Sequence, residues 1–333
     1  MRPCQKDNKS FFEKLQKAAE LDLRDNRGKR HDLAVVLVGV AIALLSNRDG
    51  CLSSIQRHLA NHYERLVVVL GAAHRRPVSR SQLPLILEKV SVTVFDRMLF
   101  ESFGISLNTQ QKKWFAVDGK EIRGSIAAGS KRGAAVIQAV AHKNCLTVAQ
   151  NYYAGEKESE VPGVRKLLTQ SGLASQKISL DALHCKPGTL QIITEGKGKY
   201  LVGLKENQKQ LKKQVGRAIE NQSVLFKTGS WEKSHGRIEA RKYEFYDVLE
   251  LEKEERWKAS QIRTAIKVSR HTEALKSGAI RREESYYLSN EVGNYEELAA
   301  AVRNHWTVET NNHLRDVTFK EDSLRSKKRN YTT

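Results

Sequence analysis

Three acidic residues stand where their side chains could act together on a phosphodiester. Asp118 ends the apolar run at 114–117, and Asp181 ends the run at 178–180. Glu309 lies within a long segment of helical pattern. Divalent metals prefer carboxylate oxygens that converge from rigid elements, and paired metals stabilise both the attacking and the leaving oxygen of a phosphodiester. The layout therefore predicts Asp118, Asp181 and Glu309 as metal ligands and catalytic residues.

The charge balance favours an extended polyanion as partner. The chain has 333 residues, with 57 Lys and Arg against 38 Asp and Glu and a formal net charge of +19, and its basic residues are spread over the whole length. Nucleic acid is the first candidate. A basic protein without such a partner is the alternative, because net charge bears on solubility and association and not on fold. The length predicts roughly two domains, each large enough for a core.

Cysteine spacing and hydropathy argue against two other classes of protein. The four cysteines include no Cys-x-x-Cys pair, which disfavours a disulfide framework and a zinc knuckle and fits a reducing, cytoplasmic setting. The pair His184 and Cys185 supplies only two ligands and predicts no soft-metal site. The apolar run at 33–45 is shorter than the roughly 20 residues of a membrane-spanning helix. We therefore expect a buried core helix there and no membrane partner.

Hydrophobic periodicity divides the chain near residue 110. Apolar residues recur at spacings of three and four in the segments 11–21, 52–59 and 83–98, which predicts an all-helical N-terminal domain over 1–110. A helix at 53–58 could cross a DNA backbone, but short helices of this kind are also common in domains that bind nothing. The second domain is then expected over 111–333.

Strand-like runs begin after residue 112. They cover 114–118, 134–142, 146–153, 177–182 and 200–204, with helical stretches at 158–170, 189–194 and 207–219. Three early strands with short links, followed by alternating helices and strands, predict an α/β domain with a mixed sheet flanked by helices. We expect two antiparallel partners first and parallel strands afterwards.

The last part of the chain predicts further strands and one long helix. The strands are expected at 239–246, 262–269 and 285–288. Asn294 is a plausible N-cap, with Glu297 as its capping-box partner, for a helix of about twenty residues. One stripe of that helix would hold Val302, His305, Glu309, Asn312, His313 and Asp316. This polar stripe either faces the sheet or forms the solvated side of the helix.

Five motifs follow one another along the second domain. They are Val-Asp-Gly-Lys-Glu-Ile-Arg-Gly-Ser at 117–125, Ser-Leu-Asp-Ala-Leu-His-Cys at 179–185, Tyr-Leu-Val-Gly-Leu-Lys-Glu-Asn-Gln at 200–208, Ser-His-Gly-Arg-Ile-Glu at 234–239 and Arg-Asn-His-Trp-Thr-Val-Glu-Thr-Asn-Asn-His at 303–313. In these motifs the chain resembles the DDE transposases of bacterial insertion sequences, in the group of the H-repeat-associated proteins.

The resemblance implies a ribonuclease H-like catalytic domain with a β-rich insertion at about 221–284. Asp118 would lie on the first strand, Asp181 on the fourth and Glu309 on the helix after the insertion. These carboxylates would hold two Mg²⁺ ions, or Mn²⁺ in their place. The implied reaction is hydrolysis of the phosphodiester at the transposon end and attack of the freed 3′-hydroxyl on target DNA. Double-stranded DNA of both kinds is the implied partner, a homodimer the expected DNA-bound state, and the nucleoid the expected location.

Six further residues are candidates for contacts with DNA phosphates or for support of the metal ligands. They are Lys205, Asn207, His235, Arg237, His305 and Arg315. Each is otherwise a surface cation or a satisfied polar group.

The chain departs from its relatives in two places. Related transposases often carry a Tyr, Arg, Glu, Lys signature around the last acid, whereas His305 and Asp316 stand here where Arg and Lys are expected. The chain also ends at Thr333, where such proteins continue, so we expect a truncated reading frame. Two alternatives follow: a truncated, inactive relative that only binds DNA, and a different nuclease on the same fold.

Overall fold

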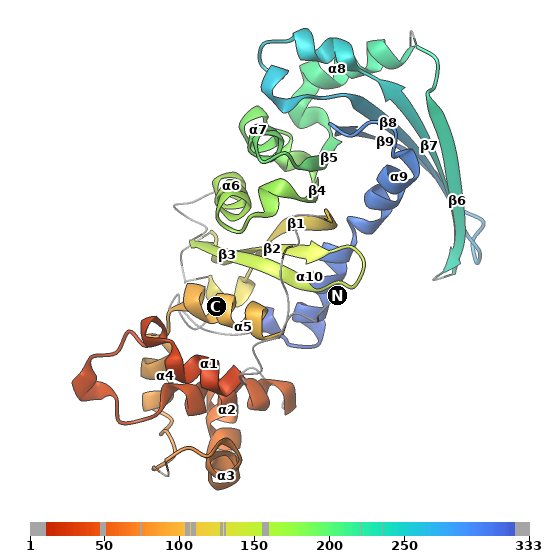
Figure 1. Ribbon diagram of the computed structural model, residues 1–333. Helices are drawn as coiled ribbons and strands as arrows, with labels where there is room; N and C mark the ends of the chain where they lie inside the picture. Colours follow the sequence, from red (N-terminus) through yellow and green to blue (C-terminus); the bar gives the residue numbers. More distant parts are fainter. Residues whose placement is uncertain are drawn as a thin grey trace, which may run out of the picture.

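The computed structural model places most of the chain in a mixed α/β arrangement with a helical segment at one end (Figure 1). It describes residues 11–46, 51–73, 75–103, 107, 111–126, 129, 131–154, 160–220, 222–234 and 236–323. The described strands form one nine-stranded sheet in the order β3-β2-β1-β4-β5-β9-β8-β7-β6.

The N-terminal segment is helical over its described residues. Its helices are α1 (Phe11–Lys17), α2 (Leu33–Ser46), α3 (Leu52–Leu70), α4 (Gln82–Leu87) and α5 (Val92–Ser102). The apolar run predicted as a core helix is α2, and Val35, Val36 and Ala43 on it are buried. Gly39 lets α3 approach, because a Cβ there would lie 2.9 Å from Leu59 Cδ1. Within the described residues, no helix combines the length and the hydropathy needed to cross a membrane.

The helical segment contacts the sheet through α5. Gln150 Nε2, on β3 (Thr147–Ala154), donates a hydrogen bond to Asp96 Oδ1 at 2.8 Å. Burial raises the pKa of Asp96 to about 6, against the opposing effect of this hydrogen bond. The expected boundary at residue 110 stays a prediction.

Five strands make the half of the sheet that carries the predicted acids. They are β1 (Trp114–Glu121), β2 (Ala134–Ala141), β3, β4 (Lys177–Leu180) and β5 (Lys199–Leu204). β2 runs antiparallel to β1 and to β3, whereas β4 runs parallel to β1 and to β5. The prediction of two antiparallel partners followed by parallel strands is confirmed.

The remaining strands extend the same sheet beyond β5. They are β6 (Phe226–Ser234), β7 (Arg237–Asp247), β8 (Thr264–Ala274) and β9 (Ile280–Ser289), all paired antiparallel, and β9 joins them to β5. The strands predicted at 239–246 and 285–288 lie within β7 and β9, and the one predicted at 262–269 overlaps β8 but starts two residues before it. We did not predict β6, because this edge strand is mostly exposed and lacks a regular alternation of apolar residues.

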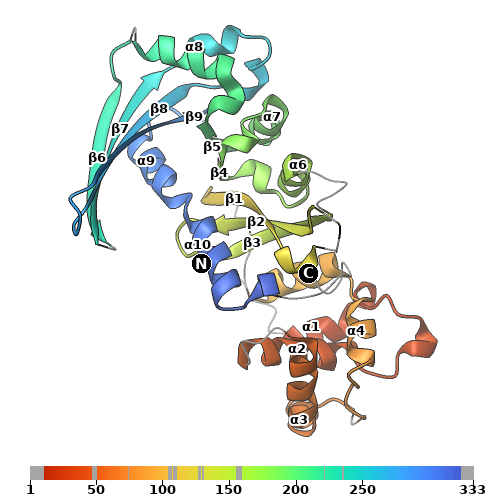
Figure 2. The ribbon, with the colours of Figure 1, turned by 180° about the vertical axis from the view of Figure 1, so that it is seen from behind.

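Alternation along β1 assigns its side chains to two faces. Phe115 and Val117 pack with the buried cluster that includes Leu167 of α6 (Glu160–Gln170) and Leu190 of α7 (Pro187–Glu195). Trp114 and Ala116 face the other way, toward α9 (Tyr295–Asn304) and α10 (Thr307–Val317). Figures 1 and 2 show these two pairs of helices on opposite sides of β1, while α8 (Lys209–Glu220) lies near β7 and β8.

The single helix expected after Asn294 is wrong. The chain forms two helices, α9 and α10, separated at His305 and Trp306. The predicted capping box is also wrong, because the Asn294 side chain makes no cap hydrogen bond. Glu297 instead accepts hydrogen bonds from Trp114 Nε1 at 3.0 Å and from Lys177 Nζ at 2.6 Å. A cation from β4 and a buried indole N–H from β1 are stronger partners for this carboxylate than a backbone amide.

Candidate active site

Asp118, in the middle of β1, and Asp181, directly after β4, lie next to each other in the interior of the sheet. β1 and β4 pair in parallel with Val117 opposite Leu180, and each acid is the residue that follows. Neighbouring strands are about 4.8 Å apart. Asp181 comes directly after β4 and accepts a hydrogen bond from the backbone N–H of Leu183 at 2.9 Å. The sequence placed Asp181 on the fourth strand, and the structure places it at the end of that strand.

The carboxyl group of Asp118 stands in a crowded, acidic environment. Burial, followed by the nearby charges of Glu160 and Asp181, raises its pKa to about 7 against the opposing hydrogen bond from the backbone N–H of Gly119. An acid that lies among other acids is a feature expected of a site that takes up cations.

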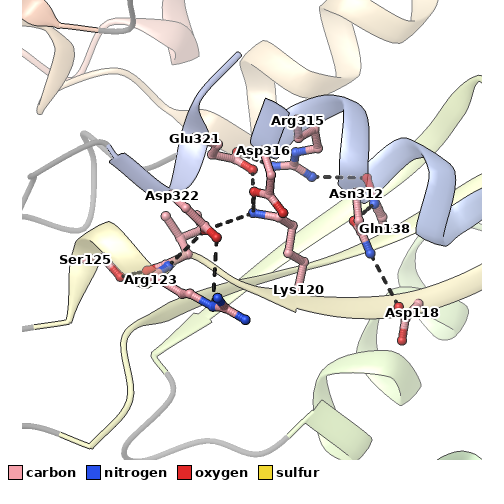
Figure 3. Close-up of polar contacts among 11 residues, drawn as sticks. Asp118, Lys120, Arg123, Ser125, Gln138, Asn312, Arg315, Asp316, Glu321 and Asp322 are labelled. Atoms are coloured by element: carbon pink, nitrogen blue, oxygen red, sulfur yellow. Dashed lines mark hydrogen bonds and ion pairs between the residues drawn. The ribbon is translucent and has the colours of Figure 1, made fainter. Parts of the chain in front are cut away.

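Glu309 lies on α10, which packs on β1 and β2. One turn after it, Asn312 Nδ2 lies 3.4 Å from Asp118 Oδ2 (Figure 3). Four residues before it, His305 Nδ1 is hydrogen-bonded to Ser179 Oγ of β4 at 2.9 Å. The turn that carries Glu309 therefore lies above β1 and β4. Glu309 is exposed. Partial burial raises its pKa above the ordinary value, against the opposing effect of the charge of Lys205.

The three acids come from strand, strand and helix as predicted, but they are not gathered around one point. In the part of the chain that the structure describes, no three His, Cys, Asp or Glu side chains form a group that could hold a metal ion. Asp118 and Asp181 are neighbours, whereas Glu309 is exposed on α10, whose buried Val308 packs on Ala116 of β1 and Val140 of β2.

A fourth acid, Glu160, belongs to this neighbourhood and was missed from the sequence. It begins α6 and lies against Gly119, where an added Cβ would be 2.6 Å from Glu160 Cδ. Glu160 Oε1 accepts a hydrogen bond from His184 Nε2 at 2.9 Å, and the same nitrogen lies 3.8 Å from Asp181 Oδ1. Glu160 lies at the charged start of the helical stretch predicted at 158–170, where nothing in its spacing linked it to Asp118 or Asp181.

The structure buries both His184 and Cys185. His184 Nε2 is hydrogen-bonded to Glu160 Oε1. Burial raises the pKa of the Cys185 thiol to about 12, so the thiol stays protonated and is a poor ligand.

The six DNA-contact candidates divide by their surroundings. Lys205 is exposed after β5, with its charge near Glu309, and Arg237 is exposed at the start of β7. Asn207 Nδ2 donates to the carbonyl of Ala182 at 2.5 Å and so holds the turn after Asp181. His235 lies outside the described residues.

The other two candidates, His305 and Arg315, contact neighbouring elements at the two ends of α10. Burial lowers the pKa of His305 to about 4, so this side chain is neutral at pH 7. Arg315 donates to Gln138 Oε1 at 3.1 Å and to Glu321 Oε1 at 2.5 Å. Their contacts fit the support of neighbouring elements better than a free phosphate contact.

The sequence of the chain is similar to those of known transposases. The sequence model of the transposase DDE domain matches residues 109–333. The H repeat-associated putative transposase YhhI of Escherichia coli (strain K12) is 26% identical over 322 residues, which cover 93% of this chain and 83% of that protein. The putative protein YbfL of the same strain is 30% identical over 236 residues, covering 67% and 61%. The putative transposase YncI of Escherichia coli O157:H7 is 26% identical over 261 residues, covering 74% and 64%.

Proposed function

Because the chain belongs to the DDE transposases of the H-repeat group, we propose that it cuts DNA at the ends of an insertion-sequence element and joins those ends to target DNA. The observation that carries this proposal is the adjacency of Asp118 on β1 and Asp181 directly after β4, with α10, the helix that carries Glu309, packed against β1. In this proposal the three acids are the catalytic residues.

The strand arrangement supports a ribonuclease H-like catalytic domain. The order β3-β2-β1-β4-β5, with β1 antiparallel to β2 and parallel to β4, is the one that brings the first and fourth strands together. In this interpretation β6, β7, β8 and the first half of β9 are the insertion, which continues the sheet rather than forming a separate layer.

The donor set fits Mg²⁺ by its chemistry. Asp118, Asp181 and Glu309 offer hard carboxylate oxygens, and the pKa of Asp118 is raised by burial and by the charges of Glu160 and Asp181, which a bound cation would offset. When bound, two such ions make a water nucleophilic and stabilise the leaving oxygen of the phosphodiester. The role of the protein itself is to hold these carboxylates in place. Glu160 lies against Gly119, next to Asp118, and His184 lies between Glu160 and Asp181.

The charge of the chain supports double-stranded DNA as the partner, both as transposon end and as target. A net charge of +19 favours binding to a phosphate backbone. Lys205 is exposed and its charge acts on Glu309, so it is well placed for a phosphate near the cut. A DNA-bound homodimer and a location at the nucleoid in the cytoplasm complete the proposal.

The test is Mg²⁺-dependent nicking of a plasmid that carries the gene with its native flanks. Wild type should cut at the flanks, and Asp181→Asn should not. Asp247→Asn is the matched control, because Asp247 is exposed and also accepts a backbone N–H two residues on, from Leu249 at 2.8 Å. Equal cleavage by wild type and Asp181→Asn would overturn the site assignment.

A further inference from the structure

The helix that carries Glu309 has little apolar contact with the sheet. Val308 is the buried residue of α10, and it packs with Ala116 and Val140. Leu314 and Val317 on the same helix are 49% and 58% exposed. A helix of this length is marginal in water on its own. Polar contacts must therefore contribute much of what holds α10 on the sheet.

Lys120 supplies the centre of those contacts. It lies on β1 two residues after Asp118, on the face that α10 covers. Its Nζ lies 2.7 Å from Asp316 Oδ1 of α10, and it donates to Glu321 Oε2 at 3.0 Å and to Asp322 Oδ1 at 3.2 Å (Figure 3). We call these four residues the Lys120 cluster. The Lys120 side chain is only 7% exposed.

The ammonium of Lys120 stays charged despite its burial. Burial alone would lower its pKa, but the contact with Asp316 and the charge of Glu321 outweigh this and raise the pKa above its ordinary value. Two arginines complete the charge balance at the edge of the cluster. Arg315 Nη2 lies 2.5 Å from Glu321 Oε1, and Arg123 Nε lies 3.9 Å from Asp322 Oδ2. Three cations thus face three carboxylates, and removal of Lys120 leaves the negative charge of three partly buried carboxylates without its central cation.

A chain of hydrogen bonds leads from the cluster back to Asp118. Arg315 Nη1 donates to Gln138 Oε1 at 3.1 Å, and Gln138 Nε2 donates to Asn312 Oδ1. Asn312 Nδ2 then points to Asp118 Oδ2 at 3.4 Å (Figure 3). Gln138 is buried and stands directly opposite Asp118 in the β1–β2 register. The contacts that hold α10 are therefore continuous with the acid on β1.

We propose that Lys120 is a positioning residue, whose cluster with Asp316, Glu321 and Asp322 fixes α10 against β1 and so places Glu309 opposite Asp118 and Asp181. Its meaning for catalysis rests on the proposed function, while the placement of α10 does not. The short segment after α10 becomes part of the site, because Glu321 and Asp322 supply two of the three carboxylates around Lys120.

The placement is tested by hydrogen exchange on the full-length protein. In Lys120→Met, amide protection over residues 307–317 should fall by at least about 100-fold, while protection of β5 and α7 is kept. Lys120→Arg should restore most of the protection, because it keeps the charge. Lys113→Met is the matched control: it removes one charge from an exposed lysine just before β1 and should change nothing in α10.

A second variant tests the same contact from the α10 side. Asp316→Asn removes one carboxylate from the α10 side, should loosen the same residues to a smaller degree, and decides the matter if Lys120→Met does not fold. Unchanged protection of α10 in both variants overturns the proposal.

Plasmid cleavage then distinguishes the positioning role of Lys120 from the proposed transposase activity. Lys120→Met should lose turnover with DNA affinity unchanged, and Lys120→Arg should regain part of it. If wild type cuts no DNA but α10 loosens as described, the proposed function fails and the positioning role of Lys120 stands.

Discussion

Asp118 should make the metal-free protein less stable as the pH rises. Its pKa is raised from an ordinary 3.8 to about 7, chiefly by burial and then by Glu160 and Asp181. Below about pH 4 the carboxyl is protonated in both the folded and the unfolded chain, so it contributes no pH-dependent difference. Between about pH 4 and 7 the folded protein keeps a proton that the unfolded chain has lost, so the free energy of unfolding falls. Above about pH 7 the full cost of the charge is present.

The size of this cost follows from the two pKa values. They differ by about three, and each pH unit corresponds to about 1.4 kcal/mol, which gives on the order of 4 kcal/mol. Solvent reaches part of Asp118, so screening makes this an upper figure. Asp118→Asn removes the charge and keeps the shape. The variant should therefore be more stable than wild type at pH 8 and equally stable at pH 4.

The assay is denaturant unfolding of both proteins from pH 4 to pH 8 in EDTA, repeated with Mg²⁺ at pH 8. Mg²⁺ should stabilise wild type, by about 2.7 kcal/mol at a hundredfold excess over its dissociation constant, and Asp118→Asn much less. A stability difference between the two proteins that does not change with pH would refute the reasoning, as would a variant less stable than wild type at pH 8.

Two further predictions concern packing and reactivity. Gly198→Ala should destabilise the protein by about 1–3 kcal/mol in denaturant unfolding, because its Cβ would lie 2.2 Å from the carbonyl oxygen of Ala174. Gly216→Ala on α8 should instead stabilise it by about 0.5–1 kcal/mol, since nothing lies within 4 Å of the new Cβ; equal effects at the two positions would contradict this account. A disulfide reagent should label the exposed Cys51 and Cys145 in the native protein but Cys185 only on unfolding, because Cys185 is buried and its thiol pKa is raised to about 12. Native labelling of Cys185 at the rate of Cys145 would contradict its burial.

Local sequence pattern predicted most strands of the sheet well, but it did not predict the break between the helices α9 and α10 that pack on it. Alternation and apolar runs located β1 to β5 and their directions, because β1, β2, β4 and β5 are buried and rich in apolar residues. β6 escaped because an exposed edge strand needs no such pattern. The continuous helix was wrong because helical periodicity runs through His305 and Trp306, where the chain turns between α9 and α10.

The same distinction applies to the candidate site. The adjacency of Asp118 and Asp181 follows from strand order, which the sequence could indicate. Glu160 and the Lys120 cluster depend on partners far apart in the chain, which no spacing encodes. Asp316 illustrates the point: it stands where a lysine was expected, and the cation beside it comes from Lys120 on β1.

The most direct test of the central claim is cleavage by Glu309→Gln, because Glu309 is the acid that the structure leaves most exposed and least gathered with the others. Its matched control is Glu296→Gln, a change at an exposed glutamate of α9. We predict that Glu309→Gln slows Mg²⁺-dependent cleavage at the element's ends by at least about 100-fold with DNA affinity unchanged, while Glu296→Gln cuts like wild type. Cleavage by Glu309→Gln at the wild-type rate would contradict the assignment of α10 to the active site.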